Sequence, residues 1–254
     1  MISTKMRGSR LALTLAAAVM AAGGAGGAEA QRLPFGPGEH AVYEVRLGAF
    51  PAGTGTLSVT GRQTVDGEQT LHTVMTLRGG NAFYRLNNRY ESWFDTDGLF
   101  SRRFHKNTHE GRSRRNRTYY FNPEMRTFRR ENQQTGTLPT SEPLDDLSFL
   151  YYARTLPLEP GATYRLPRYF KADGNPVVIQ VLRRETIRVP AGQFRAIVVR
   201  PIIQTDGMFS QGGNAEVYFS DDQHRIPVFI RTDAGWLPAS ITMRLRSFRP
   251  GNGN

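Results

Sequence analysis

The chain has 254 residues, a formal net charge of +11 and no cysteine. Without cysteine we expect no disulfide, no thiolate metal site and no lipid anchor, since such an anchor needs a cysteine at the mature N-terminus. With 39% hydrophobic residues, the chain is long enough to bury the core of one large β-domain.

Residues 1–30 have the pattern of a secretory leader. Three cations precede the apolar stretch 11–22, and Ala28-Glu29-Ala30 forms a small-x-small cleavage site before Gln31. A retained membrane anchor is the alternative, but residues 11–28 are rich in Gly and Ala and weakly apolar for a membrane span. We therefore expect export to the periplasm and a mature protein of 224 residues (254 minus 30).

The positive charge bears on the choice of partner. Loss of the leader removes three cations and one anion, which lowers the net charge from +11 to +9. Basic proteins favour anionic partners. Export disfavours nucleic acid and favours anionic lipid, lipopolysaccharide or another envelope polyanion. The alternative is that the arginines only keep strand faces and edges soluble.

Alternation of apolar and polar residues predicts strands throughout the first half of the chain. The predicted strands are 40–47, 54–60, 71–77, 89–96, 99–108, 114–121 and 126–131. Asp66-Gly67 and Asp97-Gly98 are hairpin signals between them. Residues 132–143 have the composition of a polar linker.

A single helix is predicted at 145–156. Leu147, Leu150 and Tyr151 recur at i, i+3 and i+4, and further apolar side chains cover the opposite side. A helix that is apolar nearly all round is buried. We expect it to act as a plug or hinge between two β-rich halves, 38–131 and 162–248.

The ends of this helix also have recognisable signals. Asp145 can accept hydrogen bonds from the first-turn amides, and Asp146 places negative charge at the positive end of the helix dipole. Pro157, Pro160 and Gly161 end the helix.

After the helix, strands are predicted at 163–170, 177–189, 195–205, 215–220, 228–232 and 240–248. Residues 177–182 are apolar on both faces, which is typical of a central strand. Residues 249–254 are expected to form a flexible tail.

These elements predict an all-β, mainly antiparallel fold with one central helix near residues 145–156. The short turns are compatible with a large curved sheet, an open barrel or a two-sheet sandwich. No linker is long enough to separate independent domains, so residues 31–248 are expected to form one β-rich domain.

The order of several segments resembles a bacterial family of exported domains of unknown function, numbered 3108. Gly38, Glu39, Tyr43, Gly48 and Gly53 match its usual opening, within GEHAVYEVRLGAFPAGTGTLSV. Three later segments resemble it more closely: LDDLSFLYYARTLPLEPG, VPAGQFRAIVVRP and AEVYFSDDQHRIPVFIR. The resemblance covers residues 38–248 and implies an envelope β-protein. It implies no activity and no catalytic residues.

The acidic residues and histidines are the candidates for catalytic or metal-binding groups. Neither the pair Asp145-Asp146 nor the pair Asp221-Asp222 is placed for acid/base chemistry, because capping and turn roles explain them. His105 and His109 read as a strand end and turn, where i+4 spacing is not expected to put both rings on one face. We expect no catalytic residue, no metal site and no cofactor.

The densest basic region of the chain is followed directly by aromatic residues. Seven cations lie between Arg102 and Arg117, and Tyr119, Tyr120 and Phe121 come next. Alternation places Arg115, Arg117 and Tyr119 on one face, so one face of this hairpin is predicted to be both basic and aromatic. The alternative is a solvated face opposite Phe100 and Phe104. The candidate ligand-binding residues are Arg103, His105, Arg115, Arg117 and Tyr119.

These features favour a non-enzymatic envelope protein that binds an anionic amphiphile or envelope polyanion in a concavity of the sheet. Two alternatives remain open. One is a periplasmic scaffold that binds a partner through an exposed strand edge. The other is an enzyme acting on cell-wall glycan or lipid, which would need carboxylates that converge in a cleft.

Overall fold

The structure is a computed structural model that describes residues 33–80, 85–203, 215–233 and 240–252. The predicted leader and its cleavage site before Gln31 lie outside the described residues. The turn residues 234–235, the end of the strand predicted at 195–205 and the last two residues of the tail also lie outside them.

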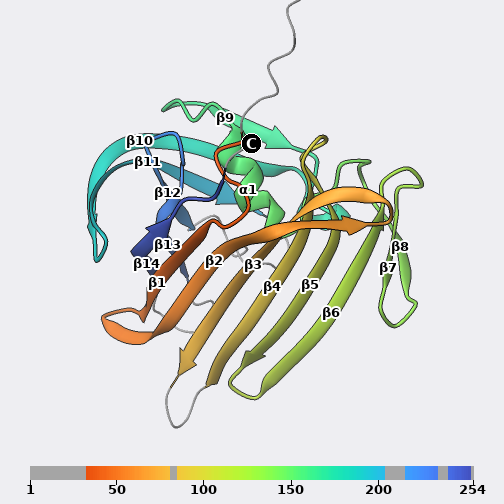
Figure 1. The fold of residues 1–254 in the computed structure, drawn as a ribbon, viewed down its shortest axis with the longest axis horizontal. Coiled ribbons are helices and arrows are strands. Elements are labelled where there is room, and N and C mark those ends of the chain that lie inside the picture. Colours follow the sequence, from red (N-terminus) through yellow and green to blue (C-terminus); the bar gives the residue numbers. More distant parts are fainter. Residues whose placement is uncertain (1–32, 81–84, 204–214, 234–239, 253–254) are drawn as a thin grey trace, which may run out of the picture. The chain divides into compact units, whose positions relative to one another are not determined.

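Within the described residues, fourteen strands form one antiparallel sheet that is not closed (Figure 1). The first eight strands are β1 (His40–Leu47), β2 (Phe50–Val65), β3 (Glu68–Gly80), β4 (Arg85–Asp95), β5 (Phe100–Glu110), β6 (Ser113–Asn122), β7 (Thr127–Arg130) and β8 (Thr135–Thr137). Helix α1 (Ser148–Thr155) follows, then β9 (Thr163–Leu166) and the short 3₁₀ helix η1 (Ala172–Gly174). The last strands are β10 (Val177–Val189), β11 (Gly192–Ile202), β12 (Glu216–Ser220), β13 (Pro227–Asp233) and β14 (Ser240–Arg249).

The sheet consists of two meanders that meet through the first and last strands. Strands β1 to β8 lie side by side in chain order, and so do β9 to β14. β1 pairs with β14, with Val45 opposite Met243, and this pairing joins the two meanders. The open edges are therefore β8 and β9, and α1 lies in the segment that connects them. The two predicted halves are parts of one sheet.

Helix α1 starts later than the pattern predicts, because residues 145–147 form the turn that leads into it. The Asp145 carboxylate accepts hydrogen bonds from the amides of Leu147 and Ser148 at 2.7 and 2.9 Å. The Ser148 hydroxyl in turn accepts one from the Asp145 amide at 2.8 Å. Asp145 therefore accepts from an amide of the first helical turn, as predicted, although Leu147 is the N-cap residue. The helix ends at Thr155, and Leu156 is already extended ahead of Pro157.

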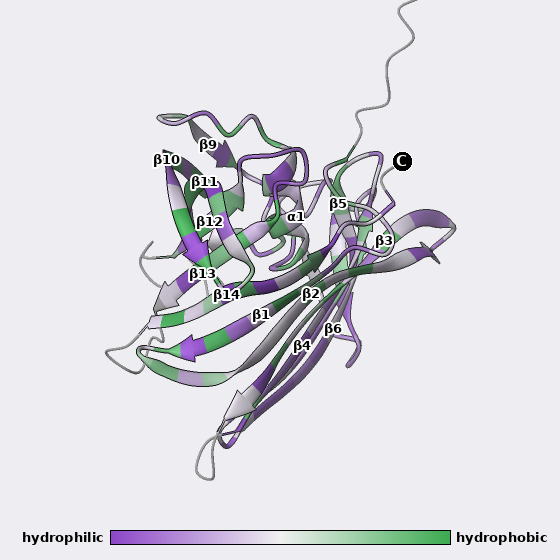
Figure 2. Ribbon diagram, turned by 60° about the vertical axis from the view of Figure 1, so that its left-hand side comes forward, coloured by the Kyte–Doolittle hydropathy of each residue, from purple (hydrophilic) through white to green (hydrophobic). Residues whose placement is uncertain are grey.

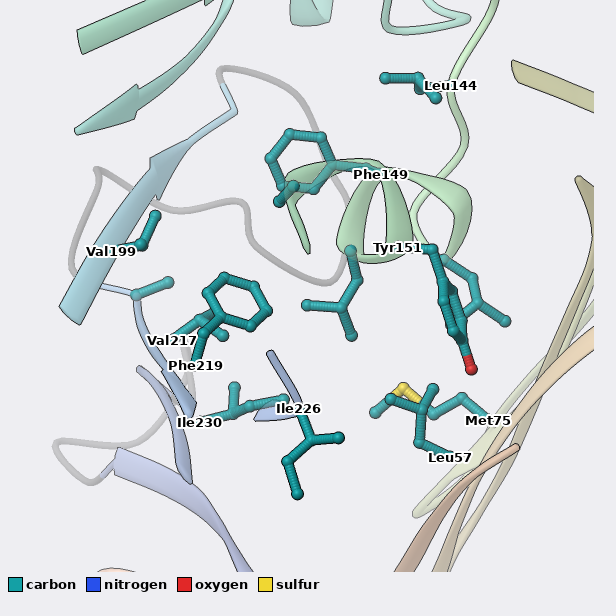
Figure 3. Packing of buried hydrophobic residues seen from close by; sticks show 14 of the residues in the cluster. Leu57, Met75, Leu144, Phe149, Tyr151, Val199, Val217, Phe219, Ile226 and Ile230 are labelled. Atoms are coloured by element: carbon teal, nitrogen blue, oxygen red, sulfur yellow. The ribbon is translucent and has the colours of Figure 1, made fainter. Parts of the chain in front are cut away.

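Strands of both meanders pack against α1, so the helix is buried as predicted. Figure 3 shows Phe149 directed toward Val199 and Phe219, and Tyr151 directed toward Leu57 and Met75. All of these side chains belong to one buried cluster. We call the sheet face that carries Leu57, Met75 and Val199 the inner face, and the opposite face the outer face.

The alternation of residue types along the strands gives the sheet one buried apolar face and one more exposed face. Along β1, hydrophilic and hydrophobic residues alternate in Figure 2. In β1 the inner residues Ala41, Tyr43 and Val45 are buried, whereas their neighbours are partly exposed. Because successive strand residues point to opposite faces, each strand has one face in the core and one face outside it.

A buried ion pair ties α1 to the rest of the domain. The Arg154 guanidinium donates to both Glu39 carboxylate oxygens at 2.7 Å. It also donates to the carbonyls of Pro34 and His224, at 3.0 and 2.7 Å. Both charged side chains are almost completely buried. Arg154 therefore holds the helix to the start of β1 and to the turn between β12 and β13.

Two expectations about the strands are wrong. The apolar run 177–182 predicts a central strand, but β10 is second from the open edge formed by β9. Its outer residues Val178, Gln180 and Leu182 are partly exposed, whereas all five residues of β12 are buried. In addition, β8 lies within the predicted linker 132–143. An apolar run shows that a strand can be buried on both faces, but the position of the strand in the sheet depends on which strands it pairs with.

Candidate functional site

The basic and aromatic residues of β5 and β6 meet on the inner face. Strand pairing places Phe104 opposite Tyr119 and Lys106 opposite Arg117. Arg115 follows one row further along β6, on the same face. The predicted alternation of Arg115, Arg117 and Tyr119 is therefore confirmed, and Lys106 joins them from the neighbouring strand.

A second segment comes from far along the chain to face these strands. The Leu144 amide donates to the Arg168 carbonyl at 2.6 Å, and the Phe170 amide donates to the Leu144 carbonyl at 3.0 Å. This short parallel pairing brings Phe170 and Lys171 beside the turn that contains Asp146.

The two segments enclose a cavity of about 230 Å³, which we call the basic-aromatic pocket. Its lining consists of three aromatic residues, four cations and one carboxylate. These residues are Phe104, Lys106, Arg115, Arg117, Tyr119, Asp146, Phe170 and Lys171. The lining thus has a formal excess of three positive charges.

The aromatic rings pack against one another on one side of the basic-aromatic pocket. The Phe170 ring centroid lies 5.0 Å from that of Tyr119 and 6.1 Å from that of Phe104. Phe104 and Tyr119 are themselves stacked at 6.2 Å. Such edge and stacked contacts hold the rings in place beside the cations, and each ring is at most 2% exposed.

The single carboxylate of the pocket already has two partners. Asp146 accepts a hydrogen bond from the Tyr169 hydroxyl at 2.7 Å and lies 3.5 Å from the Lys106 ammonium. Burial raises the pKa of Tyr169 well above its ordinary value of 10.0, and the Asp146 charge adds to this, so the hydroxyl stays protonated and can donate. By contrast, no carboxylate of the described residues lies within ion-pair distance of Arg115 or Arg117.

Asp145, the residue before Asp146, holds the turn at the edge of the pocket in place. It is fully buried, and the Ser92 hydroxyl donates to it at 2.6 Å in addition to the two turn amides. Burial raises the pKa of Asp145 to about 6, although hydrogen bonds from Ser101, Ser92 and the amides oppose the shift. Asp145 thus fixes the turn that presents Asp146 to the pocket.

Arg103 and His105 lie on the outer face, away from the pocket. The Arg103 guanidinium stacks over Trp93 at 4.3 Å and over Tyr120 at 5.2 Å. His105 contacts the Asn116 side chain at 2.7 Å and Glu91 at 3.5 Å. The five predicted site residues therefore divide into three in the pocket and two outside it. The reason is the hairpin register, which pairs even residues of β5 with odd residues of β6. Arg103 and His105 of β5 therefore face away from Arg115, Arg117 and Tyr119 of β6.

The expectation for the two neighbouring histidines is also corrected. His105 and His109 both belong to β5 and both face outward, because residues i and i+4 of a strand share a face. They lie about 13 Å apart along the strand, too far to share one ion. Among the described residues, no group of three or more His, Asp or Glu side chains is placed to hold a metal.

Five pocket residues were not among the predicted site residues: Phe104, Lys106, Asp146, Phe170 and Lys171. Phe104 and Lys106 could have been predicted from the hairpin register, because Lys106 pairs with Arg117 and Phe104 lies on the same face of β5 as Lys106. No local signal points to Phe170 and Lys171, because they reach the pocket through pairing with residue 144.

A protein-family model matches most of the chain. The family described as "Protein of unknown function (DUF3108)" matches residues 42–246. The chain belongs to the DUF3108 family. The predicted resemblance is confirmed over nearly the same range. No protein with a curated description matches this DUF3108 chain.

Solved structures resemble the fold of this DUF3108 chain at low sequence identity. A β-barrel-like protein of the DUF1849 family from Brucella abortus has a TM-score of 0.50 and 11% identity, and covers 86% of this chain and 99% of that one. A candidate exported protein with a YmcC-like fold from Bacteroides fragilis has a TM-score of 0.36 and 12% identity, covering 86% and 98%. A candidate lipoprotein from Parabacteroides distasonis has a TM-score of 0.36 and 10% identity, covering 86% and 99%.

The first of these structures supports a barrel-like, open antiparallel sheet for the DUF3108 chain. In the described part of the chain, helix α1 is too short to cross a membrane, and no other helix has the length and hydropathy to do so.

Proposed function

We propose that this protein is a non-enzymatic component of the bacterial envelope, exported to the periplasm, and that its basic-aromatic pocket binds the anionic group of an amphiphile. The observation that carries the proposal is the pair Arg115 and Arg117, which line the pocket beside aromatic rings without a carboxylate partner among the described residues. The guanidinium fork suits phosphate and carboxylate groups.

The composition of the pocket favours an amphiphile over a simple ion. An anion would pair with Arg115, Arg117 and Lys106, while an adjoining apolar group would contact the small accessible part of Tyr119 and Phe170, each 2% exposed. Removing apolar surface from water contributes about 25 cal/mol per Å². A ligand with an anionic group and an apolar group therefore contacts both the cations and the aromatic residues of the lining.

The volume of the pocket limits how much of the ligand it holds. Sites for whole small molecules usually measure about 300–1,000 Å³. The basic-aromatic pocket measures about 230 Å³, so it accommodates the anionic group and the first part of the apolar moiety. The remainder of an acyl chain would lie outside it.

Two observations disfavour the alternative functions. Hydrolysis of glycans commonly needs two carboxylates about 5–9.5 Å apart, and the pocket lining contains only Asp146. A scaffold that adds a partner strand needs a long free edge. The outermost strands β8 and β9 have only three and four residues, and the stretches of β6 and β10 that are left unpaired carry several arginines, which oppose the addition of a partner strand.

The test is a titration of the purified protein with an anionic single-chain amphiphile, such as an alkyl phosphate, below its micelle concentration. The double substitution Arg115→Gln and Arg117→Gln should weaken binding at least about tenfold, since it removes two charge-assisted contacts. The effect should shrink as salt increases, because exposed charges are screened while apolar burial is not.

The matched control is the double substitution Arg112→Gln and Arg114→Gln, which removes the same charge from the same hairpin outside the pocket lining. This variant should retain most of the affinity. Equal losses for the two variants would mean that net charge alone attracts the amphiphile, and the pocket would not be its site.

A further inference from the structure

The outer face of β3 to β6 carries a second concavity, of about 540 Å³, which we call the amide-arginine groove. It is more than twice the volume of the basic-aromatic pocket and differs from it in chemistry. Its lining is entirely polar and includes Arg78, Asn87, Asn107, His109, Arg114 and Asn116. No aromatic ring and no carboxylate lines it.

Strand pairing arranges these side chains in two adjacent rows. Arg78, Asn87, His109 and Arg114 are opposite one another across four strands. The next row places Arg89, Asn107 and Asn116 in the same way. Four strands at a spacing of about 4.8 Å extend over roughly 14 Å, a length that suits a ligand of several units rather than one small ion.

The charges of the groove are only partly compensated. Glu91 lies next to it and takes both hydrogen bonds from Arg89, each at 2.8 Å. Glu110 points to the other face, where it accepts from Asn88 at 2.5 Å. For Arg78 and Arg114, no carboxylate in the described part of the chain lies within ion-pair distance.

The types of side chain identify the ligand class. The Asn87 and Asn107 amides offer donors and an acceptor, and Asn116 keeps its donors although its oxygen already bonds His105. This combination matches sugar hydroxyls, which also donate and accept. Arginine binds carboxylate or phosphate through its planar fork. The lack of aromatic residues disfavours nucleic acid bases, which need stacking surfaces, and acyl chains, which need apolar surface.

We propose that the amide-arginine groove binds an acidic saccharide, with Arg78 and Arg114 holding its carboxylate or phosphate groups and the asparagines holding its hydroxyls. The volume lies within the range of about 300–1,000 Å³ that is usual for small-molecule sites. Most of its lining faces away from the basic-aromatic pocket, although the inner-face residues Asn88, Thr108 and Arg115 also line it. The proposal does not rest on the function proposed for that pocket. Arg115 lines both concavities and is therefore left out of the test.

The experiment titrates the purified protein with three probes: a galacturonic acid trisaccharide, the neutral galactose trisaccharide and a phosphorylated disaccharide. At least one acidic probe should bind about tenfold or more tightly than the neutral one, and the comparison between the two acidic probes identifies the preferred anionic group. No binding of either acidic probe, or equal affinity for the neutral one, would overturn the proposal.

Two double variants locate the site. Arg78→Gln with Arg114→Gln should weaken binding of the acidic probe about tenfold or more. Asn107→Ala with Asn116→Ala changes no charge and should weaken it several-fold, which general attraction to a basic surface would not produce. These side chains are exposed, so both variants should unfold at nearly the parent temperature.

Two single substitutions serve as controls. Arg117→Gln, in the basic-aromatic pocket, should leave saccharide binding intact, as should Arg112→Gln at the exposed hairpin turn. A loss through Arg112→Gln equal to that of the arginine double variant would contradict a defined groove. A loss only through Arg117→Gln would place the saccharide in the pocket and contradict the proposal as well.

Discussion

At the scale of single residues, Asp145 is a carboxylate whose protonation is linked to folding. Its folded-state pKa is about 6, against an ordinary value of 3.8, because it is fully buried. The folded protein therefore holds this proton over a range of pH in which the unfolded chain has lost it. The stabilising contribution of Asp145 is fully present below about pH 4 and is lost as pH rises through about 6.

Asp145→Asn should remove this dependence. The amide oxygen can still accept from the two turn amides, and its nitrogen can donate to the Ser92 hydroxyl, so the variant should fold. Relative to the parent, the free energy of unfolding of the variant should rise by up to about 3 kcal/mol between pH 4 and pH 7. Denaturant unfolding at several pH values measures this difference. A difference that does not change with pH would contradict the linkage.

Glu39 is the second residue with a strong expected effect. Glu39→Gln leaves the buried Arg154 guanidinium without its carboxylate, which typically costs about 3–5 kcal/mol. Glu44→Gln breaks the partly exposed pair with Arg46 on the same strand and should have a much smaller effect. Chemical denaturation of both variants makes the comparison. Similar losses would mean that Arg154 does not depend on Glu39 for its charge balance.

At the scale of elements, the central role belongs to α1, which fills the space between two parts of one curled sheet. Leu150 is only 1% exposed within its core. Leu150→Asp should therefore destabilise the domain by about 3 kcal/mol or more, since it buries a charge without a partner. Tyr152→Asp, on a partly exposed position of the same helix, should cost less. If thermal unfolding does not distinguish the two variants, the helix is not the organising element.

The elements also show what the sequence could predict. Alternation and turn signals are local, so β1 and β10 were predicted with their observed bounds, and the shared face of Arg115, Arg117 and Tyr119 followed from parity. The position of β10 near an edge depends on pairing between distant strands. The same applies to Phe170 and Lys171, which join the pocket only through the bridge between Leu144 and Tyr169.

At the scale of the whole molecule, both proposed ligands require that the protein is exported to the envelope. The leader pattern predicts cleavage after Ala30, so the mature protein should begin at or near Gln31. It should be found in the soluble envelope fraction of the cell. N-terminal sequencing of protein purified from that fraction tests this. Recovery of an intact N-terminus from the membrane fraction would contradict it.

On the two proposals above, the inner face of the sheet binds an anionic amphiphile and the outer face binds an acidic saccharide. The inner pocket combines cations with aromatic rings, and the outer groove combines cations with amides. The net charge of +9 expected after cleavage would draw anionic ligands toward both sites, and the local chemistry would then sort them.

The most direct test of the central claim compares an anionic with a zwitterionic lipid of equal chain length. Isothermal titration of the parent protein should show clearly tighter binding of the anionic lipid, and Arg115→Gln with Arg117→Gln should remove most of that preference. Equal affinity for both lipids, or binding of neither, would contradict the proposal that the basic-aromatic pocket holds an anionic amphiphile.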